Sequence, residues 1–216
     1  EGTVKIKGSL TNTGGATINT GTSTFEFNGA GQSIPVLDYY NLTINSPLST
    51  DNTNLSGATT IDNLLNINQG NLMIGLYTLT LDNGLTIGVN GQLVGSADSN
   101  LILTGSGNVI LPNLILRNLE IDRSGSIVSL GDQLTIENAL TITNGTFDLN
   151  GQTLVANSAA ISNSGTLDLS GNSDLDQSNL QMDGGSLTNS GTMSSEFSVT
   201  TLSDAVTFSG TVILDD

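Results

Sequence analysis

The sequence contains no histidine, no cysteine and no tryptophan, and the first two absences remove whole classes of active site. Without histidine or cysteine, the chain cannot build the His- or Cys-dependent catalytic dyads and triads, nor the usual zinc sites. A Ser-Lys dyad would have to use Lys5 or Lys7, close to one end of the chain. We therefore expect a protein that is not an enzyme and that has no catalytic residues and no tightly held cofactor.

Positive charge is also scarce. Four Lys and Arg residues stand against 20 Asp and Glu residues, which gives a formal net charge of −16. Such a surface repels the phosphate backbone of nucleic acids and the anionic headgroups of lipid membranes. No apolar run approaches the roughly 18 residues that a membrane helix requires. We expect neither nucleic acid partners nor insertion into a membrane.

Glycine, in contrast, is abundant and periodic. In the second half of the chain, a glycine followed by a small hydroxyl residue recurs every 20 residues, at Gly105-Ser106, Gly125-Ser126, Gly145-Thr146, Gly165-Thr166 and Gly185-Ser186. A second glycine column keeps the same step, at Gly131, Gly151, Gly171 and Gly191. Apolar residues follow two positions after the first column, at Ile127, Phe147, Leu167 and Leu187. A period near 20 is the length of one coil of a solenoid.

Between the glycines, apolar and polar residues alternate in short runs such as 140–142 and 147–149, which is typical of β-strands. Asn-Gly and Ser-Gly dipeptides separate these runs and favour tight turns. Strands begin roughly every seven residues, so three fit in one coil. We predict an all-β fold: a single parallel β-helix (β-solenoid) over residues 1–216, with about ten coils of roughly 20 residues and three short strands per coil. We expect it to be right-handed, by analogy with parallel crossovers.

The alternative fold is a pair of small β-sandwiches. Sandwich strands are longer, and their turn signals fall about 8–12 residues apart. The turn signals of this chain come more often than that. A glycine column held over four successive steps of 20 is also hard to reconcile with a sandwich, so the pattern favours the β-helix.

The sequence also contains a duplication of a unit longer than one coil. Residues 63–79 align without gaps on residues 138–154, and residues 27–44 align on 103–121 with one inserted residue. We interpret residues 25–99 and 101–175 as two copies of a unit of several coils. Residues 1–24 and 192–216 carry weaker versions of the pattern and are predicted to be terminal coils.

Stacking then assigns a role to each column of the repeat. Successive coils lie about 4.8 Å apart, so residues 20 apart become neighbours. Columns of Ile, Leu, Val and Phe are expected to fill the interior. Glycine columns are expected to turn the corners, because glycine adopts positive φ at little cost. Asparagines at corners can bond to the backbone of the next coil, which predicts ladders of asparagine side chains.

Acidic residues supply the candidate metal site. Asp148 and Asp168 lie one step apart and both point outward by spacing, as do Asp62 and Asp82. Asp174, Asp176 and Asp183 form a looser acidic cluster. Like charges stacked at coil distance repel each other, so a bridging Ca²⁺ is one hypothesis, with Asp148, Asp168, Asp174 and Asp176 as candidate ligands. The alternative is a solvated acidic face that maintains solubility.

The hydroxyl column at Ser106, Ser126, Thr146, Thr166 and Ser186 resembles an ice-binding face, but no second threonine column accompanies it. We interpret these hydroxyls as turn residues that follow the glycines. The only tyrosines are Tyr39, Tyr40 and Tyr77. They could stack on sugar rings, but we expect them to cap an apolar corner of the first copy.

The strings FNGAGQSIPVLDYYNLTI, ATTIDNLLNINQGNL and TITNGTFDLNGQTL resemble repeat segments of large secreted or cell-surface parallel β-helix proteins of Bacteroidota, which are adhesin-like. The resemblance covers about residues 25–190. The second copy departs from the pattern, because Arg117 stands where a tyrosine is expected. The resemblance implies an extracellular or cell-surface location, a stalk or adhesin role and no defined catalytic residues. Parallel β-helices also include pectate lyases and polygalacturonases, which this chain resembles in fold alone.

The expected function is therefore a structural one: a rigid extracellular stalk, an adhesin segment or a filament subunit that assembles end to end. The sequence suggests no capping helix at either end, and residues 211–214 are predicted to form an apolar strand whose open edge would invite pairing. The expected partners are further copies of the chain or the remainder of a longer chain, with surface glycans as a further possibility. The alternative function is a carbohydrate-binding module of a secreted protein.

Overall fold

A computed structural model describes residues 2–11 and 18–168, followed by the strand segments 174–177, 180–183, 186–188, 199–203 and 207–209. Every regular element in these residues is a β-strand. The strands pair in parallel and stack in coils of about 20 residues, which make a β-solenoid of about eight turns against the ten or so expected for the whole chain. The predicted parallel β-helix is confirmed, and the alternative of two β-sandwiches is wrong.

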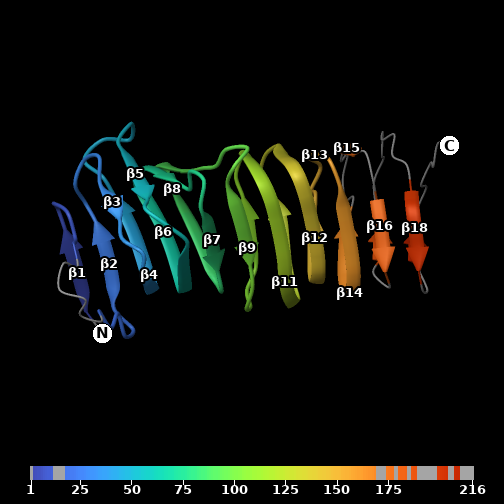
Figure 1. The fold of residues 1–216 in the computed structure, drawn as a ribbon, viewed down its shortest axis with the longest axis horizontal. Coiled ribbons are helices and arrows are strands. Elements are labelled where there is room, and N and C mark those ends of the chain that lie inside the picture. The colour runs from blue at the N-terminus through green and yellow to red at the C-terminus, as the bar shows by residue number, and fades with distance from the viewer. Residues whose placement is uncertain are drawn as a thin grey trace. The chain divides into compact units, whose positions relative to one another are not determined.

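The chain divides into two compact units, Glu1–Asn100 and Leu101–Asp216. The junction falls between the two copies that the sequence alignment delimits. Figure 1 shows successive strands side by side within each unit. The first unit contains β1 (Thr3–Ile6), β2 (Thr24–Phe27), β3 (Ser33–Ile34), β4 (Asp38–Asn45), β5 (Asn52–Leu55), β6 (Thr59–Met73), β7 (Thr78–Leu81) and β8 (Gly84–Val94), and β9 (Asn100–Leu103) covers the junction.

Each coil of the first unit has three faces, and the longer strands bend through the corners between them. The first face stacks β1, β2 and the segments 41–44, 64–67 and 84–87. The second face stacks β3, β5 and the segments 71–73 and 92–94. The third face stacks the segments 38–39 and 59–61 and then β7. The predicted three strands per coil are therefore confirmed.

The second unit repeats this arrangement with the remaining strands. They are β10 (Val109–Leu111), β11 (Leu114–Leu130), β12 (Leu134–Asp148), β13 (Thr153–Ala156), β14 (Ala159–Asp168), β15 (Asp174–Gln177), β16 (Leu180–Asp183), β17 (Ser186–Thr188), β18 (Val199–Ser203) and β19 (Thr207–Ser209). The pairing β12–β14–β17–β19 builds the second face, and β12–β14–β16–β18 builds the first.

The interior is filled by the inward side of each strand, because alternate side chains of a strand point to opposite faces. Leu42 and Ile44 of β4 stack on Leu65 and Ile67 of β6, and all four are fully buried. In the second unit, Leu140 and Ile142 have the same role. The expected inward columns of Ile, Leu, Val and Phe are confirmed for the described residues.

One inward column is shifted from its predicted position. Phe147, Leu167 and Leu187 are buried as expected, but Ile127 is 42% exposed, and the buried partner of Phe147 is Val128. The cause is an insertion in β11: Asp122 pairs with Asn144, whereas Ile127 pairs with Thr146. Three extra residues therefore bulge out of β11 and move its continuation by one place. The prediction of an inward Ile127 is wrong for this reason.

The bulge in β11 carries Arg123, whose side chain is fully buried. Its guanidinium Nη1 donates hydrogen bonds to the carbonyl oxygens of Ser106, at 3.4 Å, and Gly107, at 2.5 Å. Within the same bulge, the Ser126 hydroxyl accepts a hydrogen bond from the Gly107 amide at 3.0 Å. Arg123 and Ser126 together hold the turn at 106–107 against β11.

Asparagine side chains bond to the backbone of a neighbouring coil as predicted, from Asn83 to the Asp62 carbonyl and from Asn150 to the Leu130 carbonyl. Other asparagines bond to one another, which was not predicted. Asn63 donates from Nδ2 to Oδ1 of Asn41 at 2.8 Å, and Asn138 donates to Asn118 in the same way, also at 2.8 Å. Asn63 and Asn138 are aligned positions of the two sequence copies. On the second face, Asn71 donates to Asn52, the strand residue with which it pairs, at 2.9 Å. Asparagine amides thus join successive coils by side-chain bonds in addition to the backbone ladder.

The glycine columns hold only in part, because Gly131 and Gly165 lack the positive φ that the role of turning a corner predicts. Gly145 pairs with Gly165, as the 20-residue step predicts. Gly145 has φ +90°, and a methyl group at either position would collide with a carbonyl oxygen of the preceding coil. Gly151, in the second column, also has positive φ. Gly171, Gly185 and Gly191 lie outside the described residues.

Candidate functional site

A groove runs along one corner of the first unit, where the third face turns into the first. Its volume is about 380 Å³, which is within the usual range for small-molecule sites. Its lining is composed of hydroxyl, amide and backbone groups together with one aromatic ring. The lining residues are Gly2, Thr3, Thr22, Thr24, Tyr40, Asn41 and Asn63.

The groove exists because β4 bends within itself. Asp38 and Tyr39 pair with 60–61 on the third face, and Asn41 then pairs with Leu64 on the first. Two steps along β4 therefore match three along β6. Tyr40 occupies this irregular step, between the buried Tyr39 and the first strand residue of the next face. The adjacent tyrosines consequently have different environments.

Tyr39 packs inside the corner. It is fully buried, and its ring meets Phe25 and Phe27 edge to face, with centroid distances of 5.5 and 6.4 Å. Its hydroxyl donates a hydrogen bond to the Pro35 carbonyl at 2.9 Å, and burial raises the pKa of the phenol. The expectation that tyrosine caps an apolar corner is confirmed for Tyr39. Because this ring is buried, it offers no surface to a ligand.

Tyr40 and the two asparagines form the other side of this corner. Tyr40 is half-buried and lines the groove. The bond between Asn63 Nδ2 and Asn41 Oδ1 fixes both amide planes and uses one polar atom of each. Thr3, Thr24 and Asn41 occupy one column of paired strands that continues to Leu64. Three strand spacings of about 4.8 Å make this column about 14 Å long.

Among the lining residues that the structure describes, none carries a carboxylate or a basic side chain. Along the chain, acidic residues adjoin the lining at two places, since Glu1 immediately precedes Gly2 and Asp62 immediately precedes Asn63. Desolvation raises the pKa of Asp62, and the charges of Asp82 and Asp38 raise it further. The negative charges of Asp62 and Asp82 therefore repel each other, as expected for two aspartates on successive coils. The lining itself is uncharged and polar.

The four candidate calcium ligands do not share one column. Asp148 and Asp168 pair with each other on the second face, as predicted. Asp174 and Asp176 belong to β15 on the third face, opposite Thr153 and Val155, and their side chains lie outside the described residues. The carboxylate of Asp148 accepts a hydrogen bond from the Asn150 amide at 2.8 Å. Among the side chains that the structure describes, no three acidic groups are placed to hold one metal ion.

The hydroxyl column differs from its interpretation as a set of turn residues. Thr146, Thr166 and Ser186 pair in register on the second face, so they are strand residues. They alternate with the buried Phe147, Leu167 and Leu187 and therefore point outward. Ser126 lies outside this column, in the bulge of β11. The interpretation as turn residues is wrong for the three strand positions.

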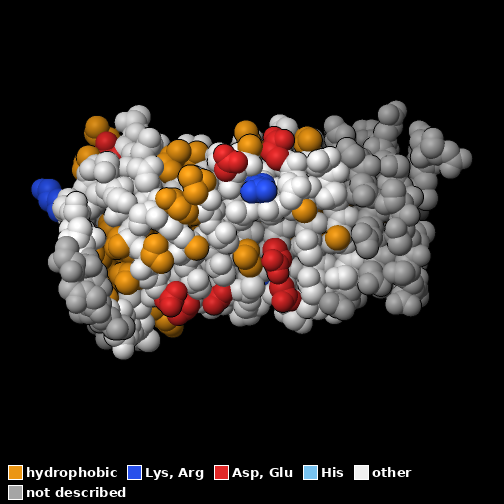
Figure 2. All heavy atoms as spheres, viewed as in Figure 1, with side chains coloured by type: hydrophobic (Ala, Val, Ile, Leu, Met, Phe, Trp, Pro, Cys, Tyr) orange, Lys and Arg blue, Asp and Glu red, His pale blue; other side chains and the backbone are white. Residues whose placement is uncertain are grey.

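Residue-by-residue reasoning missed the groove lining and Arg123. The signal for the groove was present as asparagines at one corner, Asn41 and Asn63, about one coil apart. On the face shown in Figure 2, acidic, basic and apolar side chains lie in small separate groups among polar atoms. The structure describes no helix that is long and apolar enough to cross a membrane.

Comparisons of the chain with models of known protein families, with curated proteins and with solved structures give no match.

Proposed function

We propose that this chain is a non-enzymatic structural segment of a secreted or cell-surface protein, which acts as a rigid stalk, an adhesin segment or a filament subunit. The observation that carries the proposal is the bonding between coils. Within each unit, paired strands connect successive coils, and asparagine side chains join some of these coils as well. In a solenoid, such nearest-neighbour contacts supply the stability, and side-chain bonds at the corners oppose bending between coils.

End-to-end assembly is supported by β1 in the first unit. The described residues pair β1 with β2 on one side and place no strand on its other side. The Thr24 amide bonds to the Gly2 carbonyl and the Asn28 amide to the Ile6 carbonyl. Because bonding groups alternate along a strand, the backbone groups of Thr3 and Lys5 point to the other edge of β1. An edge of this kind can pair with a further strand.

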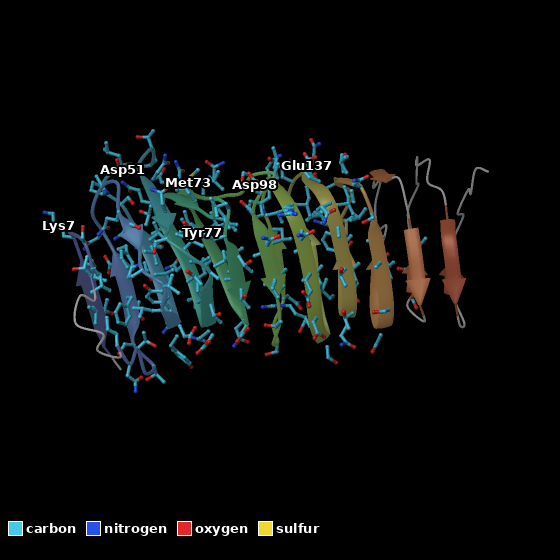
Figure 3. The ribbon with its side chains drawn as sticks, viewed as in Figure 1. Lys7, Asp51, Met73, Tyr77, Asp98 and Glu137 are labelled. Atoms are coloured by element: carbon cyan, nitrogen blue, oxygen red, sulfur yellow. The ribbon has the colours of Figure 1, made fainter. Side chains whose placement is uncertain are left out.

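The charge near β1 suits an acidic partner. Lys5 and Lys7 are two of the four cations in the chain. Lys5 pairs with Glu26 at 3.0 Å, and Asn45 donates to the same carboxylate at 3.2 Å, which ties β1 to the next two coils. Lys7 is exposed and extends past the end of β1 (Figure 3). A further copy, whose remaining surface is strongly acidic, would meet favourable charge at this edge.

Negative-stain electron microscopy of the purified chain in moderate salt, with and without Ca²⁺, tests the proposal. We expect filaments with an axial repeat of about 50 Å, near ten coil spacings of 4.8 Å. Thr3→Pro removes an outward backbone donor of β1 without removing a bond to β2, so it should abolish the filaments. Thr3→Ala retains that donor and is the matched control. Separate short rods at every condition would refute self-assembly and leave the stalk within a longer chain.

A further inference from the structure

We propose that the groove along the corner of the first unit binds a neutral oligosaccharide, with the ring of Tyr40 stacked on a sugar and the amides of Asn41 and Asn63 bound to its hydroxyls. A structural stalk requires no such groove, so this site goes beyond the function proposed above. The groove includes Thr3 of β1, but its test varies Tyr40 and Asn63, which lie outside the assembly edge, so the two proposals can fail separately.

The chemical groups of the lining match those of a sugar. A pyranose ring presents an apolar face of C–H bonds and a rim of hydroxyls, each of which both donates and accepts hydrogen bonds. Tyr40 is the aromatic residue of the described lining, and in the proposed complex its ring supplies the flat apolar surface, as aromatic rings do in many binding sites. The bond between the two asparagines uses Nδ2 of Asn63 and Oδ1 of Asn41, which leaves Nδ2 of Asn41 as a donor and Oδ1 of Asn63 as an acceptor for a ligand. Thr3, Thr22 and Thr24 add hydroxyls.

The shape of the groove favours a chain of sugars over a single one. The lining residues come from four stacked strand segments, the fourth through Asn63 at the corner before Leu64. The groove therefore extends about 14 Å along the stacking direction, from the spacing of strands. A linear oligosaccharide placed along this direction would meet hydroxyl or amide groups at each coil.

The charge distribution selects a neutral glycan. The described part of the lining contains no cation that could pair with a uronate, a sulfate or a sialic acid. Asp38 and Asp62 stand at the edge of the adjoining face, and the whole chain carries a formal charge of −16. An acidic polysaccharide would be repelled at this corner. An extended peptide is the competing occupant, but the described lining has no apolar pocket for peptide side chains.

A glycan microarray probed with the full chain tests the proposal, followed by isothermal titration with the neutral oligosaccharide that binds most strongly. The array should carry neutral glucans, mannans, galactans and xylans together with uronate-containing and sulfated chains. We expect binding to neutral chains only. Tyr40→Ala should weaken the titrated affinity at least about tenfold, and Tyr40→Phe should retain most of it, because stacking requires the ring alone.

Two further variants separate the site from general surface effects. Asn63→Leu removes the amide pair and should also weaken binding about tenfold. Tyr77→Ala removes a half-buried tyrosine outside the groove and should leave the affinity unchanged. Circular dichroism of each variant verifies the fold. No binding to any neutral glycan, binding confined to acidic glycans, or neutral binding that survives both Tyr40→Ala and Asn63→Leu would each overturn the proposal.

Discussion

Three glycines of the second unit allow backbone strain to be separated from steric collision between coils. Gly107 has φ +91°, and a methyl group placed on it would meet nothing within 4 Å. Gly165 has an ordinary φ, but its methyl group would collide with the Ile142 carbonyl of the preceding coil. Gly145 combines both conditions, with φ +90° and a collision with the Arg123 carbonyl. Substitution of each by alanine therefore isolates one cost or joins the two.

The expected losses of stability follow from these environments. Gly107→Ala should cost about 1–2 kcal/mol, the penalty for a Cβ in a left-handed conformation. Gly165→Ala should cost about 1–3 kcal/mol, as overpacking does when neighbouring backbone must move. Gly145→Ala should cost about 2–5 kcal/mol, although both effects act on one residue and need not add. The collisions place the methyl group under 3.0 Å from backbone atoms, which cannot rotate away as a side chain can.

Guanidinium denaturation followed by circular dichroism measures the three losses under one condition. Hydrogen exchange of the amides at 146–148 locates them, since the Gly145→Ala collision should open the pairing of β12 with β11. The expected order of destabilisation is Gly145→Ala first, with the two single-cause variants below it. If Gly107→Ala were as harmful as Gly145→Ala, contact between coils would not be what fixes glycine in this column.

Other predictions concern the buried arginine and the two carboxyls with shifted pKa values. Arg123→Met should lower the free energy of unfolding by about 1–3 kcal/mol, because two turn carbonyls lose a charged donor. The control Arg117→Met, at an exposed position, should change the denaturation midpoint little. Equal midpoints for the two variants would refute the structural role of Arg123. Burial alone would raise the pKa of Glu26, but hydrogen bonds from Lys5 and Asn45 and the Lys5 charge outweigh it and lower the pKa. Ionised Glu26 therefore stabilises the fold at pH values above the ordinary pKa of glutamate, and this stabilisation is lost as the pH falls through the pKa of Glu26 in the folded protein. Because Lys5 is one cause of the lowered pKa, Lys5→Met should raise the pKa of Glu26 in an NMR titration. The pKa of Asp62 is raised, first by desolvation and then by neighbouring aspartates, so its stability contribution is more favourable at acidic pH and declines as pH rises through the folded value. Asp62→Asn should therefore raise the melting temperature at pH 7 and lessen its increase on acidification, and an unchanged pH profile would contradict this.

The coil could be predicted from the sequence because its signals are local and repeated. Alternating apolar residues specify a strand, turn dipeptides end it, and a common step of 20 residues requires stacking. The asparagine bonds to the neighbouring backbone followed from the same reasoning, since Asn83 and Asn150 fall at corners. None of these inferences depends on a particular side-chain contact.

The register of individual coils could not be predicted from the step alone. Along the first face the step is 17 residues from Thr24 to Asn41 and 23 from Asn41 to Leu64. In β11 the pairing distance to the next coil changes from 22 residues at Asp122 to 19 at Ile127. Insertions at one corner are offset at another, so the average stays near 20 while single columns move. A constant step of 20 residues therefore places Ile127 in the interior, whereas the actual register places Val128 there.

The two most specific features of the described residues occur at such irregular corners. Arg123 lies in the bulge of β11. Tyr40 lies where two residue steps of β4 match three of β6. A face of the solenoid has little freedom, because its inward side chains must fill the core and its strands must stay at a fixed spacing. A corner can change length, so it can acquire a buried cation or a groove without disturbing the stack. Residues that bind a partner should therefore be sought at breaks in the register, where the repeat leaves the side chain unspecified, before the regular columns of threonine and aspartate.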